Sequence, residues 1–204
     1  MAKPTRIRQI QNKDIQMISA ISRCGHIDID HAREFIKGKN PHKRIQAWVT
    51  RGVITPITYR DGNRNERIAY ALTEKGREFA TKHMNIKNHQ PTNSEKVRHD
   101  IGTAKVYMSL SLCERETYLS EAVATKLLKE RLEDLKVSND SRYEEIYKMY
   151  HNHEISPTDG IYVKDGESNY TCLETITRNY TEQMILAKQN FAELMGYDMN
   201  MVRV

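Results

Sequence analysis

Residues 40–76, NPHKRIQAWVTRGVITPITYRDGNRNERIAYALTEKG, decide how the first part of the chain folds. Pro41 suits the first position of a helix, and Ile45, Trp48 and Val49 then recur at helical spacing. VITPITYR and ERIAYALT are runs of β-branched and aromatic residues on either side of DGNRN, a composition typical of a turn. The stretch therefore predicts one helix followed by a β-hairpin.

The flanking residues predict further helices around this stretch. Isoleucines recur every three residues within 12–24, which indicates a helix that Gly25 ends. Asp28 or Asp30 can cap a second short helix that ends at Gly38, and TEKGREFATKH predicts another helix after the hairpin. Three short helices, a hairpin and a closing helix form the order of a winged helix-turn-helix.

Polar and basic side chains mark the surface that such a domain would offer to DNA. In a winged helix the third helix enters the major groove, and the hairpin brings cations to phosphates or to the minor groove. We therefore predict that DNA is contacted by His42, Lys43, Arg44, Gln46 and Arg51 from the helix and by Arg60, Arg64 and Arg67 from the hairpin.

The charge of the chain is divided unevenly along its length. Residues 1–90 hold 18 Lys and Arg against 8 Asp and Glu, a net charge of +10, whereas residues 91–204 hold 14 against 19, a net charge of −5. This asymmetry predicts a polyanionic partner for the first part, and double-stranded DNA fits best. The alternative is a basic surface that only faces solvent.

Composition and length favour two small soluble domains. The 204 residues are 38% hydrophobic and 29% charged, which permits a buried core and excludes a disordered chain. No apolar run is long enough to span a membrane, and the start MAKPTRIRQIQNKD lacks the apolar stretch of a signal peptide, so we expect a cytoplasmic protein with no membrane partner. Cys24, Cys113 and Cys172 form no CxxC pair and are expected to be reduced.

The domain boundary is predicted within the polar stretch MNIKNHQPTNSEKVR. We assign residues 1–84 to the winged-helix domain, 85–98 to a linker and 99–204 to a second domain. The second domain reads as helix, strand, variable insertion, strand, strand, helix, strand, with no clear assignment for 138–154. The expected fold class is α/β (α+β).

Two acids fall on adjacent predicted strands of the second domain. Asp159 opens one strand and Glu174 lies in the middle of the next, so their carboxylates can share a divalent metal such as Mg²⁺ or Mn²⁺. This arrangement resembles the PD-(D/E)xK nuclease core, a restriction-endonuclease-like α/β domain, with both acids at the metal-binding positions. Ile176 stands where such a nuclease usually has Lys, and Lys188 or Arg178 can supply the cation instead.

The combination of both halves resembles a family of plasmid proteins. The pattern Ile45-x-x-Trp48-Val49-x-x-Gly52-Val53-Ile54, then Tyr70-Ala71-Leu72-Thr73-x-x-Gly76, is similar to bacterial and plasmid winged-helix proteins. Further along, His99-Asp100 opens a helix, and the motifs Pro-x-Asp-Gly, Leu-Glu and a helix with Lys-x-x-Phe follow. Together with the first pattern, they make residues 12–200 resemble replication-relaxation proteins and C-type mobilisation relaxases of plasmids and conjugative elements. The resemblance implies DNA recognition by the first domain and metal-dependent nicking by the second, with Asp159, Glu174 and Lys188 as catalytic residues.

Two functions stay open at this point. In one, the protein binds a specific DNA site in replication or conjugative transfer and nicks it. In the other, it is a non-catalytic regulator or accessory protein whose second domain forms a homodimer or binds a partner, as the missing Lys after Glu174 favours. His99, Asp100 and Glu121 are further candidate site residues, each with a structural role as the alternative. Among the tyrosines that could attack a phosphodiester, Tyr180, near Arg178 and Glu182, is the one expected close to the two acids.

Overall fold

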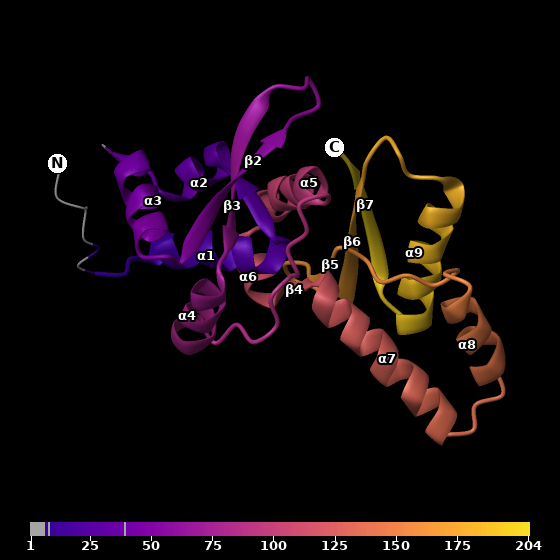
Figure 1. Ribbon diagram of the computed structural model, residues 1–204. Helices are drawn as coiled ribbons and strands as arrows, with labels where there is room; N and C mark the ends of the chain where they lie inside the picture. Colours follow the sequence, from indigo (N-terminus) through magenta and orange to yellow (C-terminus); the bar gives the residue numbers. More distant parts are fainter. Residues whose placement is uncertain (1–6, 8, 39) are drawn as a thin grey trace. The chain divides into compact units, whose positions relative to one another are not determined.

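The chain is a mixed α/β protein with two sheets (Figure 1). The computed structural model describes residues 7, 9–38 and 40–204, so the start of the predicted first domain, residues 1–6, lies outside the described part. Two compact units divide the chain, unit 1 over Met1–Ser109 and unit 2 over Leu110–Val204. Among the described helices, none is long and apolar enough to cross a membrane.

Unit 1 has the predicted order of helices and hairpin, with one strand added. Its elements are α1 (Asn12–Cys24), β1 (His26–Asp28), α2 (Ile29–Phe35), α3 (Pro41–Thr50), β2 (Ile54–Arg60), β3 (Glu66–Leu72), α4 (Glu74–Met84) and α5 (Val97–Ser109). The short strand β1 joins the hairpin in an antiparallel sheet of order β1-β3-β2. Three residues after a glycine are too few to show a strand pattern in sequence, and β1 was therefore not predicted.

Local capping explains where the helices of unit 1 begin. The Asp28 side chain accepts a hydrogen bond from the His31 backbone N–H at 2.8 Å and starts α2. Thr73 does the same for α4, accepting from the Gly76 N–H at 3.0 Å. The helices close over a core whose largest fully buried side chain is Trp48 of α3.

Gly76 is required because α4 starts against the turn between α3 and β2. A Cβ at this position would lie 2.0 Å from the backbone oxygen of Val53, which is far inside van der Waals contact. The same Val53 oxygen accepts the Thr73 N–H at 3.1 Å. The Leu-Thr-x-x-Gly pattern noted in sequence therefore reflects a close backbone approach at the end of the hairpin.

Helix α5 belongs to unit 1, which differs from the predicted boundary. The sequence suggested a linker over 85–98 and a second domain from 99, whereas α5 packs on α1 and β1 and the division falls after Ser109. Buried Asp100 contacts His26, with 2.7 Å between Oδ2 and Nδ1, and the Gln90 N–H donates to the Ser22 carbonyl at 2.8 Å. The polar stretch is thus a mostly exposed connection within unit 1.

Unit 2 has the predicted strands and last helix of the second domain, but the predicted first helix is α5 of unit 1, and the unassigned segment contains a helix. Its elements are α6 (Leu112–Thr117), β4 (Leu119–Ser120), α7 (Glu121–Val137), α8 (Tyr143–His151), β5 (Gly160–Val163), β6 (Tyr170–Ile176), α9 (Glu182–Met195) and β7 (Asp198–Arg203). The sheet order is β4-β5-β6-β7; β4, β5 and β6 pair antiparallel, and β6 pairs parallel with β7. Helix α9 makes the crossover that a parallel pair requires.

The core of unit 2 lies between this sheet and its helices. Leu128 from α7, Ile161 from β5, Cys172 from β6 and Phe191 from α9 are each fully buried in one cluster. Side chains alternate along a strand, so Glu174, two residues after Cys172, faces the same side as α9. This alternation brings a charged residue of the sheet to the helix-covered face.

Candidate nucleic-acid interface and carboxylate site

The outer face of α3 carries the polar residues predicted for DNA contact. His42, Lys43 and Gln46 are exposed, whereas Trp48 on the opposite face is fully buried. Arg51, at the end of the helix, is exposed too, and its guanidinium carbon lies 5.5 Å from the centre of the Trp48 ring. Four of the five predicted helix contacts are therefore accessible to a ligand.

Arg44 is the exception, because its guanidinium is bound inside the protein. Its Nε donates to Asp14 Oδ1 at 2.6 Å, and its Nη2 donates to the other carboxylate oxygen. Asp14 is fully buried in α1 and also accepts from Trp48 Nε1 at 3.0 Å and from the Gln11 N–H at 2.8 Å. The charge of Arg44 thus already has a partner inside the protein, which favours a structural role, and its contact with DNA stays a prediction.

The electrostatics of Asp14 agree with this role. Burial acts to raise the pKa of Asp14, but the hydrogen bonds from Arg44, the Gln11 backbone and Trp48 outweigh it and hold the pKa below its usual value. The carboxylate is therefore ionised in the folded protein at neutral pH. It ties α3 to α1 through a charged pair and an indole N–H.

The β2–β3 hairpin presents arginines of two kinds. Asp61 organises the turn by accepting the backbone N–H groups of Asn63 at 2.8 Å and Asn65 at 2.9 Å. It also accepts Arg67 Nε at 3.2 Å, and Arg67 lies 3.5 Å from an Asp30 oxygen as well. The charge of Arg67, like that of Arg44, is balanced within unit 1.

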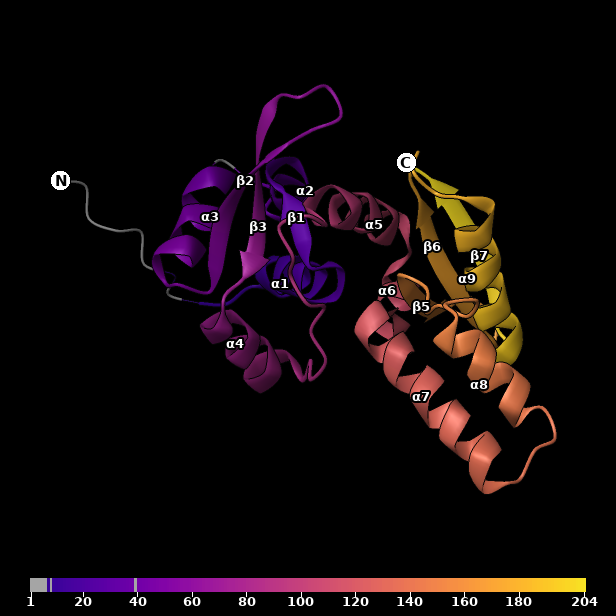
Figure 2. The ribbon, with the colours of Figure 1, turned by 45° about the vertical axis from the view of Figure 1, so that its right-hand side comes forward.

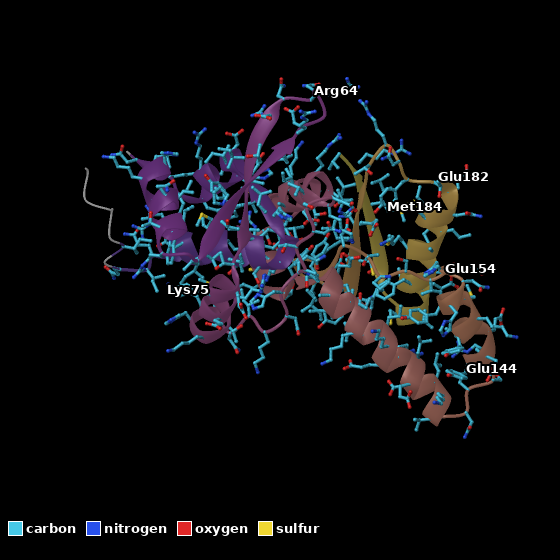
Figure 3. The ribbon with its side chains drawn as sticks, viewed as in Figure 1. Arg64, Lys75, Glu144, Glu154, Glu182 and Met184 are labelled. Atoms are coloured by element: carbon cyan, nitrogen blue, oxygen red, sulfur yellow. The ribbon has the colours of Figure 1, made fainter. Side chains whose placement is uncertain are left out.

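Arg60 and Arg64 remain available on the hairpin. Both are exposed, and within the described residues neither side chain makes a hydrogen bond or an ion pair. Figure 3 shows Arg64 at the tip of the hairpin, where it adopts a positive φ of 65°. These two guanidinium groups are the ones on the hairpin that an anionic ligand can use.

The two predicted acids of unit 2 lie opposite each other. Gly160 pairs with Leu173 in the β5–β6 register, so the next opposed positions are Asp159 and Glu174. The Asp159 N–H donates to Glu174 Oε2 at 3.0 Å, and the Thr175 N–H donates to Asp159 Oδ2 at 2.8 Å. Both acids are buried.

Lys188 supplies a cation to this pair. Its Nζ lies 3.2 Å from Glu174 Oε1 and donates to the Pro157 carbonyl at 2.5 Å. Arg178, the other cation considered from sequence, is exposed and makes no ion pair with the described residues. Ile176 occupies the usual lysine position, so the cation reaches the acids from α9 and not from β6.

Tyr180 completes the cluster. Its hydroxyl donates to Glu174 Oε1 at 2.6 Å, the same oxygen that Lys188 approaches. Burial, followed by the charges of Glu174 and Asp159, raises the pKa of the Tyr180 phenol. Tyr180 therefore acts as a hydrogen-bond donor here and stays protonated.

Glu174 has the most perturbed acidity of the site. Burial, and then the charge of Asp159, raise its pKa to about 7, while Lys188, Tyr180 and the Asp159 N–H act in the opposite direction. Near neutral pH this carboxyl group therefore exchanges a proton. A group that titrates at this pH inside a protein is common at functional sites and also occurs in structural ion pairs.

The carboxylates of Asp159 and Glu174 are the kind of oxygen ligand that a hard cation prefers. Mg²⁺ binds through one or two carboxylates together with water or phosphate oxygens, and Asp159 and Glu174 provide two such groups. Among the described residues, no cluster of three or more His, Cys, Asp and Glu has metal-binding geometry. A metal here would thus have two protein carboxylates and would take its other ligands from water or substrate.

The remaining candidate residues have separate positions. Asp100 is buried against His26, and His99 Nδ1 lies 3.9 Å from the other Asp100 oxygen, so both belong to unit 1. Glu121 is the first residue of α7, and its charge contributes to the raised pKa of Tyr180. Glu121 therefore acts on the carboxylate cluster through its charge.

No protein-family model and no curated protein matches the chain. Among solved structures, the crystal structure of Bacillus subtilis PadR in complex with operator DNA aligns with 65% of this chain and 77% of that chain at 20% identity, with a TM-score of 0.28. That score is too low to establish a shared fold.

Proposed function

We propose that the protein binds double-stranded DNA through unit 1, with α3 as the recognition helix and the β2–β3 hairpin as the wing of a winged helix. The outer face of α3 offers His42, Lys43 and Gln46, which are side chains able to reach base edges or phosphates. The hairpin adds the exposed cations Arg60 and Arg64. The excess positive charge of residues 1–90 favours the same partner.

One observation supports this proposal most directly, namely which cations have partners. Arg44 and Arg67 are neutralised by Asp14, Asp61 and Asp30, whereas Arg60 and Arg64 have no acidic partner among the described residues. Exposed guanidinium groups without an acidic partner keep their donors free for phosphate oxygens. Binding to phosphate gives them a role.

The salt dependence of DNA binding tests the proposal. The salt slope is the magnitude of the fall of log affinity with log salt concentration, and each phosphate contact adds about 0.9 to it. The double variant Arg60→Ala/Arg64→Ala should therefore lower the slope by about 1.8. The matched control Lys82→Ala/Lys87→Ala removes the same charge from exposed positions at the other end of unit 1 and should leave the slope unchanged.

Sequence preference is tested by selection from a random duplex pool. The wild type should enrich one motif, and Gln46→Ala should broaden it, because a side chain that contacts a base edge contributes about 1–3 kcal/mol of discrimination. Failure of the wild type to bind any duplex in a salt-dependent manner would end the proposal. On the resemblance noted from sequence, we place the binding event in replication or conjugative transfer of a plasmid or mobile element.

A second candidate function is metal-dependent nicking of DNA by unit 2. It is favoured by the opposed Asp159 and Glu174 and by Lys188, which lies 3.2 Å from Glu174. The order β5, β6, α9 and β7 is also the order of strands and helix on which the resemblance to a PD-(D/E)xK core rests. Bound Mg²⁺ or Mn²⁺ would polarise a phosphoryl oxygen and lower the pKa of water. Asp159 and Glu174 would hold the metal, and Lys188 would balance charge at the phosphate.

The non-catalytic alternative has its own support. Glu174 is fully buried, and its two oxygens are bound by Tyr180, Lys188 and the Asp159 N–H. In that case the cluster holds β5, β6 and α9 together, and unit 2 forms a homodimer or binds a partner protein. Nicking of supercoiled plasmid carrying the cognate origin, with Mg²⁺ or Mn²⁺, separates the two candidates. Catalysis requires relaxation by the wild type and none by Asp159→Ala or Glu174→Ala.

A further inference from the structure

Helix α5 starts beside the tip of the β2–β3 hairpin. The Arg98 Nη2 atom lies 3.7 Å from the point that a Cβ on Gly62 would occupy, so the guanidinium reaches the turn of the hairpin. Helix α5 also contacts β2, and both views in Figures 1 and 2 show it next to the hairpin. A residue assigned by sequence to the linker thus stands at the predicted wing.

The exposed face of α5 continues from Arg98 to Lys105. Seven residues are close to two helical turns, so the two side chains project from the same face about 10 Å apart along the axis. Both are exposed, whereas Asp100 points to the opposite, buried face, where it contacts His26. The solvent face of α5 therefore carries two cations and no acid.

These two cations are also uncommitted. Within the described part of the chain, neither the Arg98 nor the Lys105 side chain makes a hydrogen bond or an ion pair. They share this property with Arg60 and Arg64 on the hairpin and differ in it from Arg44 and Arg67. The available positive charge of unit 1 thus extends from the hairpin along α5.

We propose that Arg98 and Lys105 bind the phosphate backbone of duplex DNA, as a continuation of the wing along α5. This inference rests on the proposed DNA binding by unit 1. The occupant follows from charge: the four cations on the hairpin and along α5 have no acidic partner among the described residues, and the backbone of duplex DNA offers a negative charge at every phosphate. Contacts of this kind add affinity without reading sequence.

The experiment measures how the affinity of the full chain for a 40-base-pair duplex depends on salt concentration. Arg98→Ala/Lys105→Ala should lower the slope of log affinity against log salt by about 1.8, with equal loss of affinity on two unrelated duplexes. Arg98→Lys/Lys105→Arg keeps both charges and should retain the wild-type slope. The control Lys82→Ala/Lys87→Ala loses the same charge away from the hairpin, because Lys82 lies in the last turn of α4 and Lys87 follows that helix (Figures 1 and 2).

The possible outcomes separate this inference from the function on which it rests. A reduced slope for Arg98→Ala/Lys105→Ala alone supports the α5 surface. Equal slopes for this variant and the Lys82→Ala/Lys87→Ala control, with the wild type still binding, overturn the α5 surface and leave the wing and α3 in place. Absence of salt-dependent duplex binding by the wild type overturns both. Far-UV circular dichroism and thermal unfolding confirm that each variant is folded.

Discussion

Replacing Arg44 distinguishes a structural role from a DNA contact. The guanidinium binds both oxygens of Asp14, a carboxylate that is fully buried beneath Trp48 and the start of α1. Arg44→Met keeps the aliphatic stem of the side chain and removes the charge, so it leaves Asp14 ionised without a cation. We expect a large loss of stability and little change in the salt dependence of DNA binding.

The size of the loss follows from the contacts of Asp14. Removal of one partner of a buried ion pair costs about 3–5 kcal/mol, because the remaining charge is left uncompensated. The hydrogen bonds from Trp48 at 3.0 Å and from the Gln11 N–H at 2.8 Å remain and place the expected value at the lower end of that range. For a unit of this size, about 3 kcal/mol lowers the melting temperature by at least about 10 °C.

Chemical denaturation monitored by Trp48 fluorescence measures this loss, since Trp48 is the only tryptophan of the chain and lies in unit 1. The pKa of Asp14 is lowered in the folded state, so the pair contributes stability above the ordinary Asp pKa, and that stability is lost as the pH falls through the folded-state pKa. The difference between wild type and Arg44→Met should therefore shrink in acid. Adding Asp14→Asn should recover stability, because it removes the unpaired charge.

Lys43→Ala is the matched control on the same helix. Lys43 is exposed and unpaired among the described residues, so its loss should change stability by less than about 0.5 kcal/mol and lower the salt slope by about 0.9. The reasoning is refuted if Arg44→Met is as stable as the wild type while its salt slope falls like that of Lys43→Ala. Arg44 would then contact DNA as its position in the sequence suggested.

Three further changes test unit 2 and the start of α4. The folded state raises the pKa of Glu174 to about 7, so the wild type should lose up to about 3 kcal/mol of stability as the pH rises from 4.5 to 7. Glu174→Gln removes this titration and should flatten the pH dependence. Urea denaturation followed by circular dichroism measures both. Gly160→Ala places a Cβ 2.3 Å from the Tyr118 ring, so we expect a loss of about 1–3 kcal/mol that Tyr118→Ala partly relieves; equal melting temperatures for Gly160→Ala and wild type would contradict it. Gly76→Ala meets the Val53 backbone oxygen and should cost about 3 kcal/mol, measured by thermal unfolding.

Much of unit 1 is predictable because its signals are local. Pro41 at the start of α3 and the caps Asp28 and Thr73 each act within three or four residues, and the turn DGNRN lies between two clear strand patterns. Contacts between distant residues carry no such signal. The Arg44–Asp14 pair spans thirty positions, so the sequence shows an exposed helical arginine where the structure has a bound one.

The same reason explains the outcome at the carboxylate cluster and at the boundary. Asp159 and Glu174 lie on adjacent predicted strands joined by a short turn, so the sequence alone predicts that they are neighbours. The sequence also offers Lys188, on the next helix, as the cation. The contact that assigns α5 to unit 1, between His26 and Asp100, joins residues 74 positions apart. A polar stretch with a proline reads as a linker when that contact is unknown.

The position of α5 determines how this chain can be divided. A fragment that ends at residue 90 would keep the whole helix-and-hairpin pattern, yet it would uncover the sides of α1 and β1 on which α5 packs and leave His26 without its acid. A fragment that ends at Ser109 keeps both. The part of the chain that could be exchanged between proteins or fused to another activity therefore includes α5, one helix more than the helix-and-hairpin pattern seen in the sequence.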